Sequence, residues 1–240
     1  KELRRAASRL SFATMTSLPI QVLWTTLATL ILTVCGVNFM GPNTIGGFPP
    51  TAYYLISSIA SFLSMVLPFS FFLFFGKRKL SDTVLVEKNG VLNSVLLVFA
   101  GLAVSVLMNI PANLISQLLE GAGLNGDANT ADLLALTPVQ ALTMFVSVVL
   151  VAPVTEEFAF RSVTTAVMRR WGDWPAVIFS ALIFGMAHYS IQSLPVVLTA
   201  GFVMALLYVR TRNIWVNIFV HMLNNLLATL PIALEGLVGA

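Results

Sequence analysis

Apolar runs long enough to cross a lipid bilayer constrain the fold of this chain more than any other feature. A transmembrane helix needs roughly 17–25 mostly apolar residues to cross ~30 Å of hydrocarbon. Only 10% of the residues are charged, against about a quarter in soluble domains. Seven apolar runs can be drawn, at about 18–38, 53–75, 91–110, 139–160, 175–191, 194–210 and 214–232. The sequence therefore predicts an all-α, polytopic transmembrane helical bundle with about seven (six to eight) spans.

Two places interrupt this pattern. Pro111 and a Gly/Asn/Asp-rich stretch weaken it across 111–138, and Pro153 with the charges that follow weakens it across 152–168. Proline removes a helix hydrogen bond and clashes with the preceding turn, so we expect a helix boundary in each place. No segment is long enough for a soluble domain, and residues 1–240 are predicted to form a single integral membrane domain.

Positive charges indicate the sidedness of the protein. With a cytoplasmic N-terminus, every basic residue except Arg161 falls on the cytoplasmic side, where Lys and Arg are usually in excess. These residues are Lys1, Arg4, Arg5, Arg9, Lys77, Arg78, Lys79, Lys88, Arg169, Arg170, Arg210 and Arg212. The net charge of +3 follows from this distribution and does not indicate nucleic acid as a partner. We expect a multi-pass integral membrane protein in the lipid bilayer of a prokaryotic plasma membrane.

A short set of polar side chains remains inside the predicted spans. A charge at bilayer depth costs about 2.5 kcal/mol or more, so such residues need an explanation. Counted from the cytoplasmic ends of their spans at ~1.5 Å per residue, Glu157, His188 and His221 lie at roughly 18, 21 and 14 Å depth. They would share one site if their helices converge. The full set is Glu156, Glu157, Arg161, His188, His221, Asn224 and Asn225.

Helical phase divides the two glutamates. Glu157 and Arg161 are four residues apart and can form an ion pair on one face, whereas Glu156 projects about 100° away. We expect Glu157 to be the structural partner of Arg161 and Glu156 to be the freer carboxylate. In the alternative interpretation, both glutamates only neutralise Arg161 and hold helices together.

The same spacing pairs two residues of the last predicted span. His221 and Asn225 are four residues apart and share a face, whereas Asn224 lies off that face. We expect Asn224 to hydrogen-bond a neighbouring helix.

A carboxylate, two imidazoles and an amide in a membrane are suited to peptide hydrolysis. A carboxylate or histidine can take a proton from water, and donors can stabilise the oxyanion. The sequence contains neither a Gly-x-Ser-x-Gly stretch nor a His-Glu-x-x-His helix. Glu156, His188 and His221 could still hold Zn²⁺ or another divalent metal with one open position, so both a metal-dependent and a metal-free mechanism stay open.

Three short motifs carry a family resemblance. "EEFAFR" (156–161), "FGMAH" (184–188) and "HMLNN" (221–225) match Glu-Glu-x-x-x-Arg, Phe-x-x-x-His and His-x-x-x-Asn in order and approximate spacing. Over about 139–230 the chain thus resembles the CAAX-protease and bacteriocin-processing (CPBP) family of intramembrane proteases. That family includes the type II CAAX prenyl endopeptidase, and its members often have eight spans.

The resemblance implies an intramembrane endopeptidase that cleaves a peptide bond near the cytoplasmic side of the membrane. It implies that Glu156 works with His188 to activate water and that His221 and Asn225 line the oxyanion site. Members are described both as metalloproteases and as glutamate-dependent enzymes without metal. The expected substrate is a peptide or protein, including membrane-associated or lipidated ones. The expected catalytic set is Glu156, Glu157, Arg161, His188, His221 and Asn225.

Two other functions remain as alternatives. The chain could be a non-catalytic membrane scaffold or a bacteriocin-immunity protein, because the family includes proteins linked to such roles. It could also be a small proton-coupled transporter, since intramembrane Glu and His can relay protons. A transporter is expected to have two pseudo-symmetric halves, and the sequence contains no such repeat.

Overall fold

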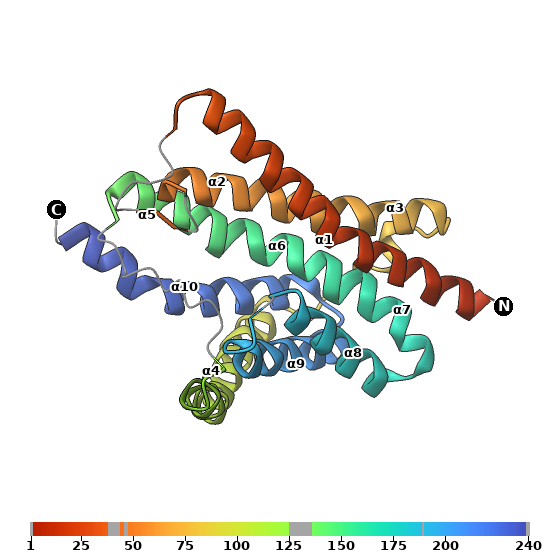
Figure 1. The fold of residues 1–240 in the computed structure, drawn as a ribbon. Coiled ribbons are helices and arrows are strands. Elements are labelled where there is room, and N and C mark those ends of the chain that lie inside the picture. The colour runs from red at the N-terminus through yellow and green to blue at the C-terminus, as the bar shows by residue number, and fades with distance from the viewer. Residues whose placement is uncertain (1, 38–43, 46–47, 125–135, 189, 239–240) are drawn as a thin grey trace.

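The computed structural model describes residues 2–37, 44–45, 48–124, 136–188 and 190–238. Helices form the regular structure of these residues, together with two isolated β-bridges (Figure 1). The α-helices are α1 (Glu2–Val34), α2 (Pro50–Ser61), α3 (Leu67–Phe75), α4 (Val91–Gly121), α5 (Pro138–Met144), α6 (Ala152–Glu156), α7 (Ala166–Met168), α8 (Asp173–Met186), α9 (Leu194–Thr211) and α10 (Ile214–Val238). Wider π-helical segments are η1 (Phe62–Val66), η3 (Phe145–Val151) and η4 (Glu157–Thr165), and tighter 3₁₀ segments are η2 (Leu80–Asp82) and η5 (Arg169–Trp171).

The predicted polytopic helical bundle is confirmed. In the described part of the chain, six helical stretches are long and apolar enough to cross a membrane, one fewer than the seven apolar runs. They are Ser8–Val34, Pro50–Phe75, Val91–Gly121, Pro138–Trp171, Leu194–Thr211 and Ile214–Pro231. The chain is a multi-pass integral membrane protein.

The run at 175–191 does not form a spanning helix. It contributes most of α8, which has 14 residues and ends at Met186. A helix of this length extends for only ~21 Å, which is less than the thickness of the hydrocarbon core. α8 packs closely along α9, and a Cβ atom added to Gly201 would lie 2.9 Å from the ring of Phe184. Glycine at this position therefore allows the close approach of the two helices.

The expected helix boundary within 111–138 is present, since α4 ends at Gly121, but the boundary expected within 152–168 is absent, and neither Pro111 nor Pro153 interrupts its helix. α4 continues past Pro111 to Gly121, and the helical stretch from Pro138 to Trp171 continues through Pro153. The π-helical η3 ends two residues before Pro153, and its wider turns accommodate a missing N–H and a bulky ring within a continuous helix. The rest of the weak region, at 125–135, lies outside the described residues.

η4 lies at the centre of the bundle. It contacts α3, α8, α9 and α10, and nearly all of its side chains are buried. The hydroxyls of Thr164 and Thr165 each donate a hydrogen bond to the carbonyl five residues earlier, at 3.0 Å. These bonds satisfy buried polar groups inside the π-helical turns. The segment that carries Glu157 and Arg161 is therefore packed against several other helices.

The basic segments gather at one end of the bundle. Figure 1 shows the N-terminal end of α1, the end of α3 and α7 at the same end, opposite the C-terminal end of α10. Arg9 donates a hydrogen bond to the Phe75 carbonyl at 3.0 Å. In the loop after η2, Glu87 pairs with Arg212 of the α9–α10 turn at 2.7 Å. This arrangement agrees with the charge pattern, and the cytoplasmic location of this end stays a prediction.

We predict that single cysteines at positions 78 and 170 react with a membrane-impermeant maleimide only after the cells are permeabilised. The basic ends should face the cytosol. The exposed native Cys35 is first replaced by serine. Cysteine at the exposed position 120, at the other end of α4, serves as the control that is labelled in intact cells. Labelling of position 78 or 170 from outside would reverse the assigned sidedness.

Candidate active site

Two helices bring the adjacent glutamates and one histidine together. Glu156 is the last residue of α6 and Glu157 the first of η4, and His221 comes from α10. The Nδ1 atom of His221 lies 2.9 Å from Oε1 of Glu157. The expected convergence of these helices is therefore confirmed for Glu157 and His221.

The predicted ion pair between Glu157 and Arg161 is also confirmed. Arg161 Nε lies 3.3 Å from Glu157 Oε2, and both side chains are completely buried. The guanidinium carbon lies 4.3 Å from the centroid of the Phe184 ring, a cation–π contact with α8. Among the described residues, none of the three guanidinium nitrogens has a hydrogen-bond partner. The charge of Arg161 is thus balanced mainly by Glu157.

Asn217 of α10 completes the surroundings of Glu157, and the sequence analysis missed it. This fully buried side chain donates through Nδ2 to Glu157 Oε2 at 3.3 Å and to the Met204 carbonyl of α9 at 2.6 Å. A signal was present, because residues 217, 221 and 225 follow one another at four-residue intervals and lie along one side of a helix. Asn217 ties the buried carboxylate to two further helices.

Glu156 is the more accessible carboxylate, as predicted. Its side chain is 16% exposed, and Oε2 lies 3.8 Å from Nε2 of His221. Because an ionised carboxylate accepts hydrogen bonds and cannot donate them, Nδ1 of His221 carries the proton that it shares with Glu157. Nε2 is then the nitrogen that faces Glu156. Together, Glu156 Oε2 and His221 Nε2 form a pair of polar atoms within reach of one small molecule.

His188 lies outside the predicted helix. It follows the end of α8, its side chain is exposed, and its Nδ1 lies 2.9 Å from the Phe184 carbonyl. The expectation of a histidine inside a spanning helix is wrong here, because α8 ends at Met186. The rings of His188 and His221 pack against the same Phe184 ring, with centroid distances of 4.7 and 5.9 Å. His188 therefore shares a ring contact with His221, and within the described residues it forms no hydrogen bond or ion pair with Glu157 or His221.

The two asparagines of α10 differ from the prediction in one respect. Asn225 Nδ2 donates to the Val148 carbonyl of η3 at 2.9 Å, so Asn225 forms the interhelical hydrogen bond expected of Asn224. In the described part of the chain, the side chain of Asn224 forms no hydrogen bond. An amide nitrogen carries two N–H groups, and the bond to Val148 uses one of them.

The candidate metal ligands do not form a complete set. Glu156 and His221 approach within 3.8 Å, but among the described residues His188 forms no ion pair or hydrogen bond with either of them. In the residues described, no group of three or more His, Cys, Asp or Glu side chains has an arrangement that could hold a metal ion. The geometry therefore does not fit the three-ligand site considered from the sequence, and we derive no reaction step through a metal.

Comparison with known proteins supports the motif assignment. Residues 138–227, which hold all of these side chains, match the family described as type II CAAX prenyl endopeptidase Rce1-like. Residues 138–227 are similar to this family and are called the Rce1-like region below. The predicted family resemblance is thereby confirmed.

One curated relative extends the comparison. The chain is 31% identical over 140 residues to the Bacillus subtilis (strain 168) protein named "Putative membrane peptidase YdiL". The match covers 58% of this chain and 57% of the relative's length. The chain has no significant match among solved structures.

Arg161→Ala in the Rce1-like region should lower folded yield and thermal stability. Removing one partner of a buried ion pair leaves an unpaired charge, here that of Glu157, and costs about 3–5 kcal/mol. Glu156→Gln should leave the melting temperature close to that of the wild type, because Glu156 is partly exposed. Thermal unfolding of both purified variants in the same detergent measures the difference. Equal losses of stability would contradict this division between the two glutamates.

Proposed function

We propose that this protein is an intramembrane endopeptidase that hydrolyses a peptide bond near the cytoplasmic side of the membrane. The observation that carries the proposal is the pairing of a partly exposed carboxylate, Glu156, with Nε2 of His221 inside an Rce1-like region. The curated relative, whose name describes a membrane peptidase, supports the same reaction class. The substrate is a peptide or protein at the membrane, including lipidated ones.

Glu156 acts as the general base in this scheme. Its carboxylate takes a proton from the attacking water, which lies between Glu156 Oε2 and the neighbouring imidazole. The 3.8 Å separation of Oε2 from His221 Nε2 supports this role, since both atoms can contact one water molecule. His188 assists in activating the water, because the Phe184 carbonyl binds its Nδ1 and leaves Nε2 available.

His221 and Asn225 stabilise the oxyanion that develops on the substrate carbonyl. Asn225 contributes the N–H group that is not bonded to Val148. His221 donates through Nε2 when both ring nitrogens are protonated, with Glu156 and Glu157 as the neighbouring negative charges. Glu157, Arg161 and Asn217 act indirectly, because they fix the position of the His221 ring.

Glu156→Gln should reduce peptide cleavage by about 10²–10⁴-fold, the usual contribution of a general base. His188→Ala should lose activity in the same range. Purified proteins are incubated with a peptide library, and the products are identified by mass spectrometry. Glu120→Gln, which changes an exposed carboxylate of α4, is the matched control and should cleave at the wild-type rate.

Two results would contradict the proposed chemistry. Wild-type cleavage by Glu156→Gln or His188→Ala protein would exclude the water-activation scheme. Loss of wild-type activity after treatment with a strong chelator, with recovery on addition of Zn²⁺, would show a metal-dependent reaction instead. If no peptide is cleaved by the wild-type protein and Glu156→Gln binds membrane partners normally, the scaffold alternative is favoured.

Asn225→Ala should cleave peptide about 10²–10³-fold more slowly, as expected for the loss of one oxyanion donor. Folding should change little, because interhelical hydrogen bonds of this kind contribute on the order of 0.6 kcal/mol. Peptide binding should persist. Turnover and binding are compared with Asn224→Ala, which changes the adjacent amide. Equal turnover of the two variants would remove Asn225 from the oxyanion site.

A further inference from the structure

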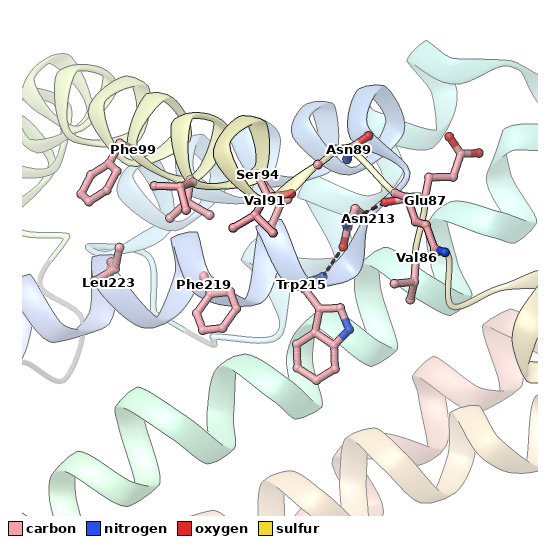
Figure 2. Close-up of a pocket in the computed structure, with 15 residues that line it drawn as sticks. Val86, Glu87, Asn89, Val91, Ser94, Phe99, Asn213, Trp215, Phe219 and Leu223 are labelled. Atoms are coloured by element: carbon pink, nitrogen blue, oxygen red, sulfur yellow. Dashed lines mark hydrogen bonds between the residues drawn. The ribbon is translucent and has the colours of Figure 1, made fainter.

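A cavity of about 700 Å³ lies between the first turns of α4 and α10, beneath the loop that precedes α4 (Figure 2). Its walls are apolar and include Val95, Phe99, Trp215, Phe219 and Leu223. Positions 219 and 221 of a helix project about 200° apart, so the cavity lies on the face of α10 opposite His221. It is therefore separate from the candidate active site.

The rim of this cavity is held by a network of hydrogen bonds. Asn213 donates to the Glu87 carbonyl at 2.9 Å and accepts from the Trp215 backbone N–H at 3.0 Å, as the dashed lines in Figure 2 show. The Tyr208 hydroxyl donates to the Thr83 carbonyl at 2.7 Å. These bonds join the loop to the α9–α10 turn. These hydrogen bonds therefore fix the position of the loop at the opening of the cavity.

The charges at the rim favour an anionic ligand. Glu87 is paired with Arg212 at 2.7 Å, and Figure 2 shows its carboxylate directed away from the cavity. Lys88 lines the cavity with an exposed side chain that has no ion pair with the other described residues. α4 begins at Val91 without a side-chain cap and without an acidic residue in its first turn, so no side chain accepts from its first backbone N–H groups.

The length of the cavity corresponds to one leaflet of a bilayer. Its lining runs from Val91 to Phe99 on α4 and from Trp215 to Leu223 on α10. Eight residues of helix extend for ~12 Å, close to half of the ~30 Å hydrocarbon core. Trp215 is 53% exposed near the polar end of the cavity, as is usual for tryptophan at a membrane–water interface.

We propose that this cavity binds one phospholipid with an anionic headgroup, taken from the leaflet that surrounds the loop at 83–90. The headgroup contacts Lys88 and the first turn of α4, and an acyl chain lies against the walls formed by α4 and α10. Lys88 at the rim suits the anionic headgroup, and the apolar cavity, about as long as one leaflet is thick, suits an acyl chain. This binding is independent of peptidase activity.

Native mass spectrometry of the full chain in detergent, titrated with phosphatidylglycerol or phosphatidylcholine, tests the site. The wild type should bind one phosphatidylglycerol more tightly than phosphatidylcholine. Lys88→Gln should weaken binding of phosphatidylglycerol about fivefold, the usual contribution of one lysine at an anionic membrane, and leave phosphatidylcholine unchanged. Lys79→Gln, which changes an exposed lysine just before η2 that does not line the cavity, should have no effect. Val95→Trp should weaken binding of both lipids.

Several outcomes would overturn the proposal. Equal binding of the two lipids by the wild type would remove the anionic selectivity. Equal effects of Lys88→Gln and Lys79→Gln would show a general charge effect without a site. Unchanged binding by Val95→Trp protein that melts like the wild type would exclude the cavity. Full competition by glycerol phosphate would show a headgroup site alone, and a dimer lost in Val95→Trp would assign this face to a second copy of the chain.

Discussion

The buried ion pair between Glu157 and Arg161 is the interaction on which the arrangement of the candidate site depends. Either charge alone would be costly at membrane depth. Within the bundle, each charge compensates the other at 3.3 Å, with both side chains fully buried. The pair also joins elements that are distant in sequence, because Arg161 packs on Phe184 of α8 and Glu157 accepts hydrogen bonds from Asn217 and His221 of α10. The charges that bring α8 and α10 to η4 thus also orient the imidazole.

The contacts that Glu157 makes determine which carboxylate remains free to react. Both of its oxygens are engaged, so it is suited to hold His221 in one orientation. Glu156, one residue earlier, is 16% exposed and faces the other nitrogen of the same ring. The two adjacent carboxylates therefore have different roles because their surroundings differ. Glu157 holds the His221 ring, and Glu156 is left free to react. The cavity that we propose to bind lipid lies on the opposite face of α10, so the same helix separates the two sites.

Local spacing explains which features could be predicted from the sequence. The Glu157–Arg161 pair and the greater exposure of Glu156 follow from the geometry of a single helix. The spanning helices follow from apolar runs that are long enough to cross the bilayer. Features that depend on packing between helices could not be predicted. The helix through Pro153 continues because a π-helical segment precedes the ring. His188 leaves its helix because α8 is short, although the apolar sequence continues to residue 191. Hydropathy contains no information on either feature.

A double-mutant cycle on Glu157→Gln and Arg161→Met tests the central claim most directly. The free energy of unfolding is measured for the wild type, both single variants and the double variant in one detergent. We predict that each single variant is strongly destabilised and that the double variant loses less than the sum by about 1 kcal/mol or more, since each single change leaves a buried charge unpaired. Losses that add within about 0.5 kcal/mol would show that the two residues are energetically independent and would contradict the central role of the pair.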